Sequence, residues 1–141
     1  MSNKLKIVLD TNVLLVSLSE KSNYHWVWKL ILENKIELYI TNEILSEYEE
    51  IITNRVGSDA ANVLLILLLE LENVRQSLVY YKYNLIKADT DDNKFVDCYL
   101  ASNCDYIITN DKHFNVLKEI NFPKINCLNL TEFSTLINEL K

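Results

Sequence analysis

Short apolar runs alternate along this chain with longer segments in which apolar residues recur every three or four positions. A short run that is continuously apolar, or that alternates with polar residues, is typical of a strand, and the wider periodicity is typical of an amphipathic helix. By this criterion the sequence predicts strands at residues 4–10, 36–40, 105–109 and 125–128. Residues 77–81 fit either another short strand or an extended linker.

Polar residues that can accept hydrogen bonds from free backbone N–H groups precede most of the helical segments. The predicted helices begin near Thr11 or Asn12, Ser22 or Asn23, Thr41 or Asn42, Asp59, Asp91 or Asp92, and Thr131. Gly57 precedes the helix at 59–73, which is apolar on nearly all sides between Val63 and Leu69. Such a helix is either buried on several sides or used in an interface. Strands that alternate with helices predict a parallel α/β sandwich with right-handed crossovers.

Composition places the chain among ordinary globular domains. Its 141 residues, of which 49% are hydrophobic and 24% charged, predict a single domain that spans residues 1–141 and buries a core. No apolar run is long enough to cross a bilayer, and the first residues lead directly into a strand rather than a signal sequence. We therefore expect a cytoplasmic protein with no membrane partner. Cysteines without metal-type spacing predict reduced core thiols, namely Cys98, Cys104 and Cys127.

The scarcity of glycine and histidine excludes several classes of enzyme. With Gly57 as its only glycine, the chain can form neither the glycine-rich dinucleotide fingerprint nor the phosphate-binding loop of P-loop enzymes. Its 2 histidines leave little room for a zinc cluster or a Ser–His triad. A net charge of −6 argues against a nucleic-acid partner, unless the acids gather at a metal site where bound divalent ions reverse the local potential. Any catalysis is therefore expected to depend on carboxylates.

The most distinctive part of the chain is acidic, because segments 89–97 and 107–111 together contain five aspartates. At helical spacing, Asn93 and Asp97 share one face, and Asp92 lies just above them. Like charges placed this closely repel one another unless something offsets them. Two interpretations remain open from this stretch alone: a solvated helix N-terminus favoured by the helix dipole, and a site for a hard cation.

A calcium-binding EF-hand loop can be excluded. Asp89, Asp91 and Asn93 fall at the first three ligand positions of such a loop. Lys94 and Leu100, however, stand where the loop requires glycine and a bidentate glutamate.

Acids elsewhere in the chain favour the cation site. In an open parallel sheet the working crevice lies outside the carboxyl ends of the strands. The acids that fall at or near this edge are Asp10, Glu43, Glu47, Asp92, Asp97 and Asp111. Mg²⁺ and Mn²⁺ prefer carboxylate and water ligands, and either ion can polarise a phosphodiester and activate an attacking water. Each aspartate alone is more often a cap or a turn residue, but their convergence is hard to explain structurally.

Segments 8–13, 41–48, 89–97 and 105–111 resemble, in order, the motifs of the PIN-domain nuclease family. The resemblance covers nearly the full chain and is strongest for the bacterial branch described as toxin components of toxin–antitoxin systems. It implies a three-layer α/β/α sandwich with a central, mostly parallel sheet, and Mg²⁺- or Mn²⁺-dependent cleavage of single-stranded RNA. An antitoxin partner and a homodimer are further implications.

The resemblance also assigns roles to individual residues. It implies that the metal-binding catalytic acids are Asp10, Glu47, Asp92, Asp97 and Asp111, with the hydroxyl of Thr109 in support. We expect further support for this site from Thr11, Asn12, Glu43 and Asn93. Asn110 departs from the family pattern, in which a small residue or glycine is usual at this position. Lys94, Lys112 and His113 are the nearest candidates for contacts with RNA phosphates.

Two other functions are compatible with a fold of this class. One is a catalytically inactive PIN-like module that binds RNA or a protein, and metal-dependent turnover would separate it from a nuclease. The other is a phosphoacceptor receiver domain, which pairs two adjacent acids near its first strand and carries a late lysine. Residues 6–10 are not accompanied by such a pair, so the nuclease is favoured.

Overall fold

The structure, a computed structural model, describes residues 4–87 and 90–140. One five-stranded sheet lies at its centre, and every neighbouring pair of strands is parallel. The strands are β1 (Lys6–Leu9), β2 (Glu37–Ile40), β3 (Val74–Gln76), β4 (Tyr106–Ile108) and β5 (Cys127–Leu128). Their order is β3-β2-β1-β4-β5, so the chain builds the sheet outward from β1 on one side and then on the other.

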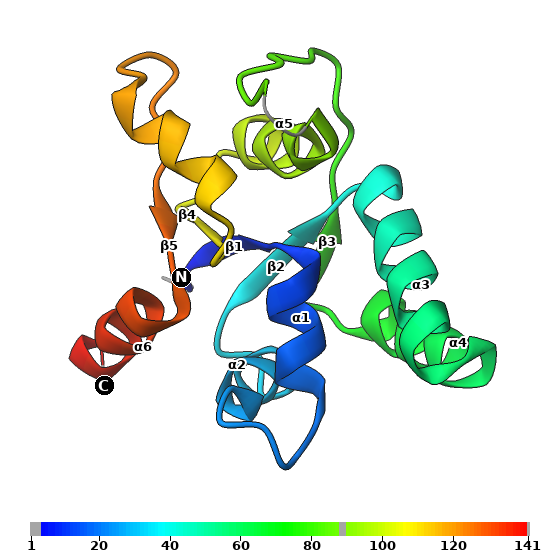
Figure 1. The fold of residues 1–141 in the computed structure, drawn as a ribbon. Helices are drawn as coiled ribbons and strands as arrows, with labels where there is room; N and C mark the ends of the chain where they lie inside the picture. Colours follow the sequence, from blue (N-terminus) through cyan, green and yellow to red (C-terminus); the bar gives the residue numbers. More distant parts are fainter. Residues whose placement is uncertain (1–3, 88–89, 141) are drawn as a thin grey trace.

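Helices cover both faces of this sheet, as Figure 1 shows. They are α1 (Thr11–Leu18), α2 (His25–Leu32), α3 (Asn42–Val56), α4 (Ser58–Glu70), α5 (Asn93–Ser102) and α6 (Leu130–Glu139), with short 3₁₀ helices η1 (Thr90–Asp92) and η2 (Lys112–Glu119). Helix α5 packs over the central strands, whereas α1 and α2 lie on the opposite face. Helix α6 contacts α2 through Trp26 and Phe133, whose ring centroids are 5.5 Å apart. The predicted three-layer α/β/α sandwich is confirmed; Asp89 lies outside the described residues.

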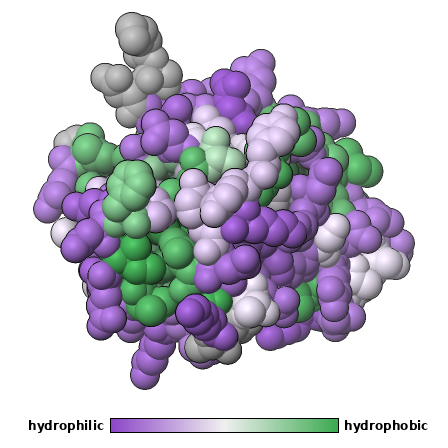
Figure 2. All heavy atoms as spheres, turned by 90° about the horizontal axis from the view of Figure 1, so that it is seen from above, coloured by the Kyte–Doolittle hydropathy of each residue, from purple (hydrophilic) through white to green (hydrophobic). Residues whose placement is uncertain are grey.

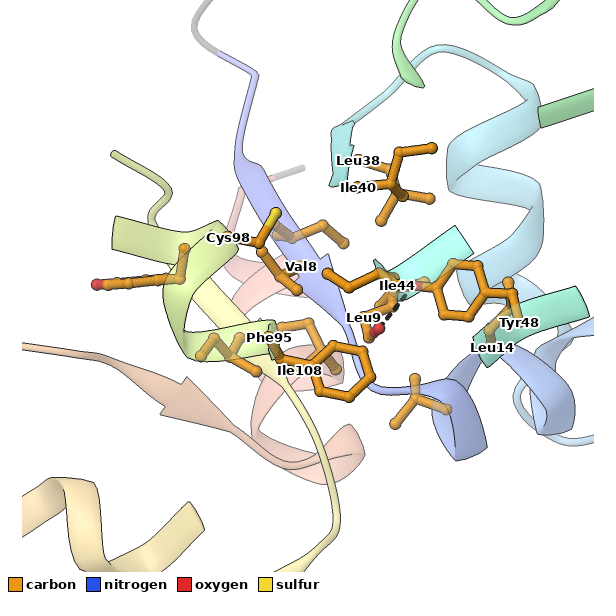
Figure 3. Close-up of a cluster of buried hydrophobic side chains, with 14 of the residues drawn as sticks. Val8, Leu9, Leu14, Leu38, Ile40, Ile44, Tyr48, Phe95, Cys98 and Ile108 are labelled. Atoms are coloured by element: carbon orange, nitrogen blue, oxygen red, sulfur yellow. Dashed lines mark hydrogen bonds between the residues drawn. The ribbon is translucent and has the colours of Figure 1, made fainter. Parts of the chain in front are cut away.

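The core is built around strand β1. Ile7, Val8 and Leu9 are all fully buried, as expected for a central parallel strand covered on both faces. Figure 3 shows residues from β1, β2, β4, α3 and α5 meeting there. The Tyr48 hydroxyl, which comes from α3, donates a hydrogen bond of 2.6 Å to the Leu9 carbonyl. This bond holds α3 against the carboxyl end of β1, beside Asp10.

Two helices begin with side-chain caps. The Thr41 hydroxyl accepts a hydrogen bond from the Ile44 N–H at 3.2 Å, which confirms the predicted start of α3. Helix α6 begins two residues earlier than predicted, because Asn129 rather than Thr131 caps it. Asn129 and Glu132 form a reciprocal capping box, in which each side chain accepts a hydrogen bond from the backbone of the other.

Two further elements start elsewhere than predicted. Helix α2 begins after Tyr24, which makes no capping hydrogen bond, and not after Ser22 or Asn23. The Ser22 hydroxyl instead accepts a hydrogen bond of 3.0 Å from the Tyr24 N–H, and the resulting turn delays the helix. Residues 77–81 are not a strand; the edge strand β3 lies earlier in the chain, where it pairs with β2.

Helix α4 follows directly on the break at Gly57. This glycine has a φ of 97°, a backbone conformation that other residues rarely adopt. One side of α4 packs into the core through Ala61, Leu64, Leu65 and Leu68. Val63, Ile66 and Leu69 are exposed on its other side. The helix is therefore a core element on one side and an apolar surface on the other, and its use as an interface stays a prediction.

The thiols match the expectation of reduced core cysteines. Cys98, Cys104 and Cys127 are free, and the first two are buried. Burial raises the pKa of Cys98 and that of Cys127 to about 12, so both are protonated thiols at neutral pH. Within residues 4–87 and 90–140, no helix is both long enough and apolar enough to cross a membrane.

Candidate active site

The candidate site lies where the order of strands reverses, between β1 and β4. In doubly wound sheets, ligands bind at such a switch point, outside the carboxyl ends of the strands. Asp10 directly follows β1, and its N–H donates a hydrogen bond of 3.1 Å to the Ile108 carbonyl at the end of β4. The Thr109 hydroxyl then donates to Asp10 Oδ2 at 2.8 Å. Both side chains are buried, so the two strands hold this carboxylate in a defined orientation.

Asp111 lies beside this pair. Its N–H donates a hydrogen bond of 3.0 Å to the Thr109 hydroxyl, so Thr109 links the Asp10 carboxylate to the backbone of Asp111. Burial raises the pKa of the Asp10 carboxyl. The hydrogen bond from Thr109 opposes this rise, and the negative charges of Asp111 and Glu47 add to it. The pKa of Asp10 is therefore raised by its burial and by neighbouring carboxylates, as at a site prepared for a cation.

Glu47 reaches the same group from α3. The Thr11 hydroxyl donates a hydrogen bond to Glu47 Oε2, and Lys94 Nζ lies 2.5 Å from Glu47 Oε1. Each carboxylate oxygen of Glu47 therefore has a partner from a different element, one on α1 and the other on α5. Glu43, one turn earlier on α3, is exposed and pairs with Lys82 at 3.3 Å. The structure thus brings Glu47, but not Glu43, to Asp10.

Asp92 joins the group beside Asp111. It is buried at the end of η1, and ligand atoms of Asp92, Asp111 and His113 all lie within 4.8 Å of one another. His113 Nδ1 is 3.7 Å from Asp92 Oδ2 and 3.4 Å from Asp111 Oδ1. The predicted capping role is wrong: Asp92 occupies the N-cap position of α5, but its side chain makes no capping hydrogen bond.

His113 is the member of this group that sequence reasoning assigned only to phosphate contacts. The Asp111 carboxylate accepts a hydrogen bond of 2.8 Å from the backbone N–H of His113 and so caps the start of η2. That turn brings the imidazole back over the acids. The two-residue spacing of Asp111 and His113 after a strand was the available signal, since an aspartate at a turn commonly binds the N–H two residues on.

Asp97 and Asn93 have different surroundings. Asp97 Oδ1 accepts a hydrogen bond of 3.1 Å from the Tyr83 N–H. Burial raises the pKa of Asp97, the hydrogen bond from Tyr83 and the charge of Lys82 lower it, and Glu43 raises it. The Asp97 carboxylate thus faces the Lys82 and Glu43 side of α5, where a cavity of about 190 Å³ adjoins Lys94.

The two asparagines that were predicted to support the site do not join this group of acids. Asn93 is buried, and its side-chain amide forms two hydrogen bonds with the backbone of Ile86. The Ile86 N–H donates to Asn93 Oδ1 at 2.9 Å, and Asn93 Nδ2 donates to the Ile86 carbonyl at 2.8 Å. It therefore fastens the segment before α5 to the helix. Asn12 is exposed on α1.

The residues present fit a divalent cation of the hard kind. The donors gathered at the switch point are the carboxylates of Asp10, Glu47, Asp92 and Asp111, and oxygen ligands are those that Mg²⁺ and Mn²⁺ prefer. Lys94 offsets the charge of Glu47. A cation among these carboxylates would offset the remaining charge.

The comparisons with known proteins agree with this geometry. The family model for the PIN domain matches residues 6–113. The chain is similar to the structure of VapBC2 from Rickettsia felis bound to a DNA fragment from their promoter, with 15% identity, a TM-score of 0.61, and coverage of 89% of this chain and 98% of that chain. For FitAcB from Neisseria gonorrhoeae the identity is 19%, the TM-score 0.57, and the coverage 87% and 96%. No curated protein matches the chain.

A further similarity is to the PIN domain endonuclease Utp24, with 21% identity, a TM-score of 0.52, and coverage of 89% of this chain and 84% of that chain. At these identities the solved structures establish the fold. The residues matched by the family model include the four acids at the switch point, namely Asp10, Glu47, Asp92 and Asp111. The chain belongs to the PIN domain family.

Proposed function

We propose that this protein is a metal-dependent endoribonuclease that cleaves single-stranded RNA in the cytoplasm as the toxin component of a toxin–antitoxin pair. The observation that carries the proposal is the meeting of buried and half-buried carboxylates from separate elements at one switch point. The family supports nuclease chemistry, and one similar structure is described as an endonuclease. RNA as the substrate and Mg²⁺ or Mn²⁺ as the ion are inferred from the donor set and the family resemblance.

Asp10, Glu47, Asp92 and Asp111 are the proposed ligands, with His113 beside them. A bound Mg²⁺ or Mn²⁺ supplies a Lewis acid that activates water and offsets charge on the phosphodiester. The protein contributes orientation: Thr109 holds Asp10, while Thr11 and Lys94 hold the two oxygens of Glu47. These groups fix the carboxylates before substrate arrives, which lowers the reorganisation required during the reaction.

Asp97 stays in the proposed set as a fifth acid. It lies on α5 one turn beyond Asn93, and its carboxylate is buried. Because it faces the adjoining cavity and not Asp111, it would act on a second ion or on an ion that reaches the Lys94 side of the site. Asp97→Asn should therefore reduce cleavage less than Asp10→Asn.

Cleavage of a labelled single-stranded RNA by the purified protein, with Mn²⁺, Mg²⁺ or EDTA, tests the proposal. The wild type should cut only with a divalent ion, and Asp10→Asn and Glu47→Gln should not cut. Glu49→Gln, an exposed neighbour on α3, is the matched control and should keep full activity. Full activity in both site variants overturns the assignment. Absence of both cutting and metal binding in the wild type favours an inactive binding module.

The proposal that the protein is a toxin depends on a partner protein and on an effect on the host cell. Similar structures include VapBC2 bound to a DNA fragment from their promoter and FitAB bound to the IR36 DNA fragment. We propose that the chain binds an antitoxin and forms a homodimer. The exposed apolar residues of α4 are the surface we assign to one of these two contacts, with the antitoxin or with a second copy of the chain. Expression of the wild type in a bacterial host should arrest growth, whereas Asp10→Asn should not. Normal growth with an active wild-type nuclease would leave the enzyme but remove the toxin role.

A further inference from the structure

The segment from residue 78 to 87, here termed the aromatic segment, connects the edge strand β3 to the elements that carry the acids. The Ser77 N–H, just before it, donates a hydrogen bond of 2.8 Å to the Ile40 carbonyl at the end of β2. Further along, the Tyr83 N–H binds Asp97, and Ile86 exchanges two hydrogen bonds with Asn93. Its backbone is therefore fastened to α5 at two points, although it contains no helix or strand.

Tyrosine rings project from this fastened backbone into solvent. Tyr80 is 89% exposed, Tyr81 67% and Tyr83 39%. The Tyr81 and Tyr83 rings pack edge to face with centroids 4.6 Å apart, which leaves the face of a ring available. Figure 2 views the molecule from the side on which α5 lies in Figure 1, where patches of hydrophobic residues interrupt a largely hydrophilic surface. Exposed aromatic groups gathered in one place mark a binding surface.

The charge of the aromatic segment is opposite to that of the whole chain. Residues 78–87 contain Lys82 and Lys87 and no acidic residue, whereas the chain has a net charge of −6. Lys82 pairs with Glu43 at 3.3 Å, but both side chains are largely exposed, and exposed pairs contribute little stability. Both lysines can therefore turn towards a phosphate.

The aromatic segment is also continuous with the candidate active site. Leu78, Val79 and Lys82 line the cavity of about 190 Å³ that Lys94 and Asp97 line from α5. Lys94 in turn contacts Glu47 at 2.5 Å. A strand lying along the segment would thus reach the acids across the Lys94 ammonium.

We propose that the aromatic segment is a stacking platform for single-stranded RNA, which bases bind through the rings of Tyr80 and Tyr81. Lys82 and Lys87 contact the adjacent phosphates, and the strand continues past Lys94 to the acids. Aromatic rings and a basic backbone track are the combination that binds single strands without a sequence preference, because every base has a π-face. Bases within a duplex are stacked on each other, so this surface selects single strands. This inference rests on the proposed function for its substrate class.

The test measures binding separately from cleavage. Fluorescence anisotropy of a labelled 12-nucleotide RNA is recorded in EDTA with Asp10→Asn protein, so that no strand is cut. Adding Tyr80→Ala and Tyr81→Ala should weaken binding by about 25-fold or more, since two stacked bases are lost and each contributes a factor of roughly five to 150. Adding Tyr80→Phe and Tyr81→Phe should retain the affinity, because the rings remain. Phe122→Ala removes a ring that is 92% exposed elsewhere and is the matched control, with no change expected.

An abasic strand of the same length separates stacking from charge attraction. It should bind the parent protein as weakly as the intact RNA binds the double alanine variant, and duplex RNA should also bind weakly. Equal affinity of the parent and the double alanine variant overturns the platform, as does equal binding of duplex and single strand. Thermal unfolding of each variant must match that of the parent.

The outcome also separates this inference from the proposed function. Tyrosine-dependent binding by a wild type that never cuts RNA with any metal supports the platform and removes the nuclease. Metal-dependent cutting that the double alanine variant performs with an unchanged KM supports the nuclease and removes the platform. A wild type that binds no RNA also removes the platform, and the exposed tyrosines would then belong to a protein interface.

Discussion

At the scale of single residues, the site is defined by hydrogen bonds that orient acids before any ion binds. Asp10→Asn tests this arrangement directly. The amide oxygen can still accept the Thr109 hydrogen bond, while the charge that repels Asp111 and Glu47 is lost. We expect cleavage to disappear and the melting temperature in EDTA at neutral pH to rise by a few degrees, since 1 kcal/mol corresponds to about 2–4 °C at this size.

Differential scanning fluorimetry with and without Mn²⁺ measures the second effect. The wild type should be stabilised by Mn²⁺, and Asp10→Asn should respond far less. A lower melting temperature for Asp10→Asn in EDTA would show that the Asp10 charge stabilises the fold and that the repulsion argument is wrong.

Lys94 is a positioning residue in this scheme, because its ammonium contacts Glu47 Oε1 and so orients a proposed metal ligand. Lys94→Gln should lower kcat by about tenfold or more, the usual effect of losing a hydrogen bond between charged groups. Mn²⁺ should bind about fivefold more tightly, since roughly 1 kcal/mol of repulsion between two cations is removed. Calorimetry and single-turnover cleavage separate the two effects, with Lys118→Gln, exposed on η2, as the control. Weaker Mn²⁺ binding would contradict this role.

Sequence reasoning at this scale succeeded where backbone position alone decides. Asp10 and Asp111 follow adjacent parallel strands, so their proximity could be predicted from the strand ends. The direction of a side chain is different, because it depends on groups distant in sequence. Asp97 turns towards the Tyr83 N–H, and His113 folds back over Asp111 through a turn. Neither contact leaves a periodic pattern in the chain.

At the scale of secondary-structure elements, Gly57 joins two long helices without a loop. It closes α3 and precedes α4 with a φ of 97° and a ψ of 164°, a region almost restricted to glycine. Among the described residues, no heavy atom beyond the adjoining chain lies within 4 Å of the position that a Cβ would occupy, so the strain of Gly57→Ala is conformational. We expect a loss of about 1–3 kcal/mol in the free energy of unfolding.

Urea denaturation checks this expectation, with Ser58→Ala as the matched control in the next position. Ser58 is the first residue of α4 and is exposed, so its replacement should change stability by less than about 0.5 kcal/mol. Equal effects of the two substitutions would show that the junction tolerates another backbone conformation.

Long elements with a side-chain cap could be predicted from the sequence more accurately than short elements without one. Helix α3 is long and has Thr41 as a local start signal, so its first residue could be predicted. Strand β3 has three residues, two of them polar, and its conformation is imposed by pairing with β2. Such an element carries little information of its own, and the sequence left open whether the more apolar residues 77–81 form a strand or a linker.

At the scale of the whole molecule, alternation of strands and helices was enough to predict the layers, because a parallel sheet requires crossovers on its faces. The strand order was not available from any local pattern, since it depends on which edge of β1 each later strand joins. That the acids share the carboxyl edge of the sheet could be predicted from the sequence, whereas the two strands that flank the switch point became visible only in the folded chain.

Gathering acids in this way should make the stability of the whole protein depend on pH and on metal. The pKa values of Asp10 and Asp97 are raised in the folded state, chiefly by burial. The folded chain therefore holds these protons at pH values where the unfolded chain, with an aspartate pKa of about 3.9, has lost them. Their contribution to stability is complete below that value and is lost as the pH rises through the raised folded pKa values.

In EDTA, the free energy of unfolding should accordingly contain a component that falls as the pH rises above about 4. Urea titrations at several pH values, on the wild type and on the Asp10→Asn/Asp97→Asn variant, isolate this pH-dependent component, because the variant lacks both titrating groups. Glu49→Gln/Glu50→Gln, two exposed acids on the same helix as Glu47, should keep the wild-type slope. Mn²⁺ at a hundred times its Kd should add about 2.7 kcal/mol to the wild type at neutral pH, because it binds only the folded site. Parallel slopes in the wild type and the double aspartate variant would mean that burial of these two carboxylates costs the fold nothing.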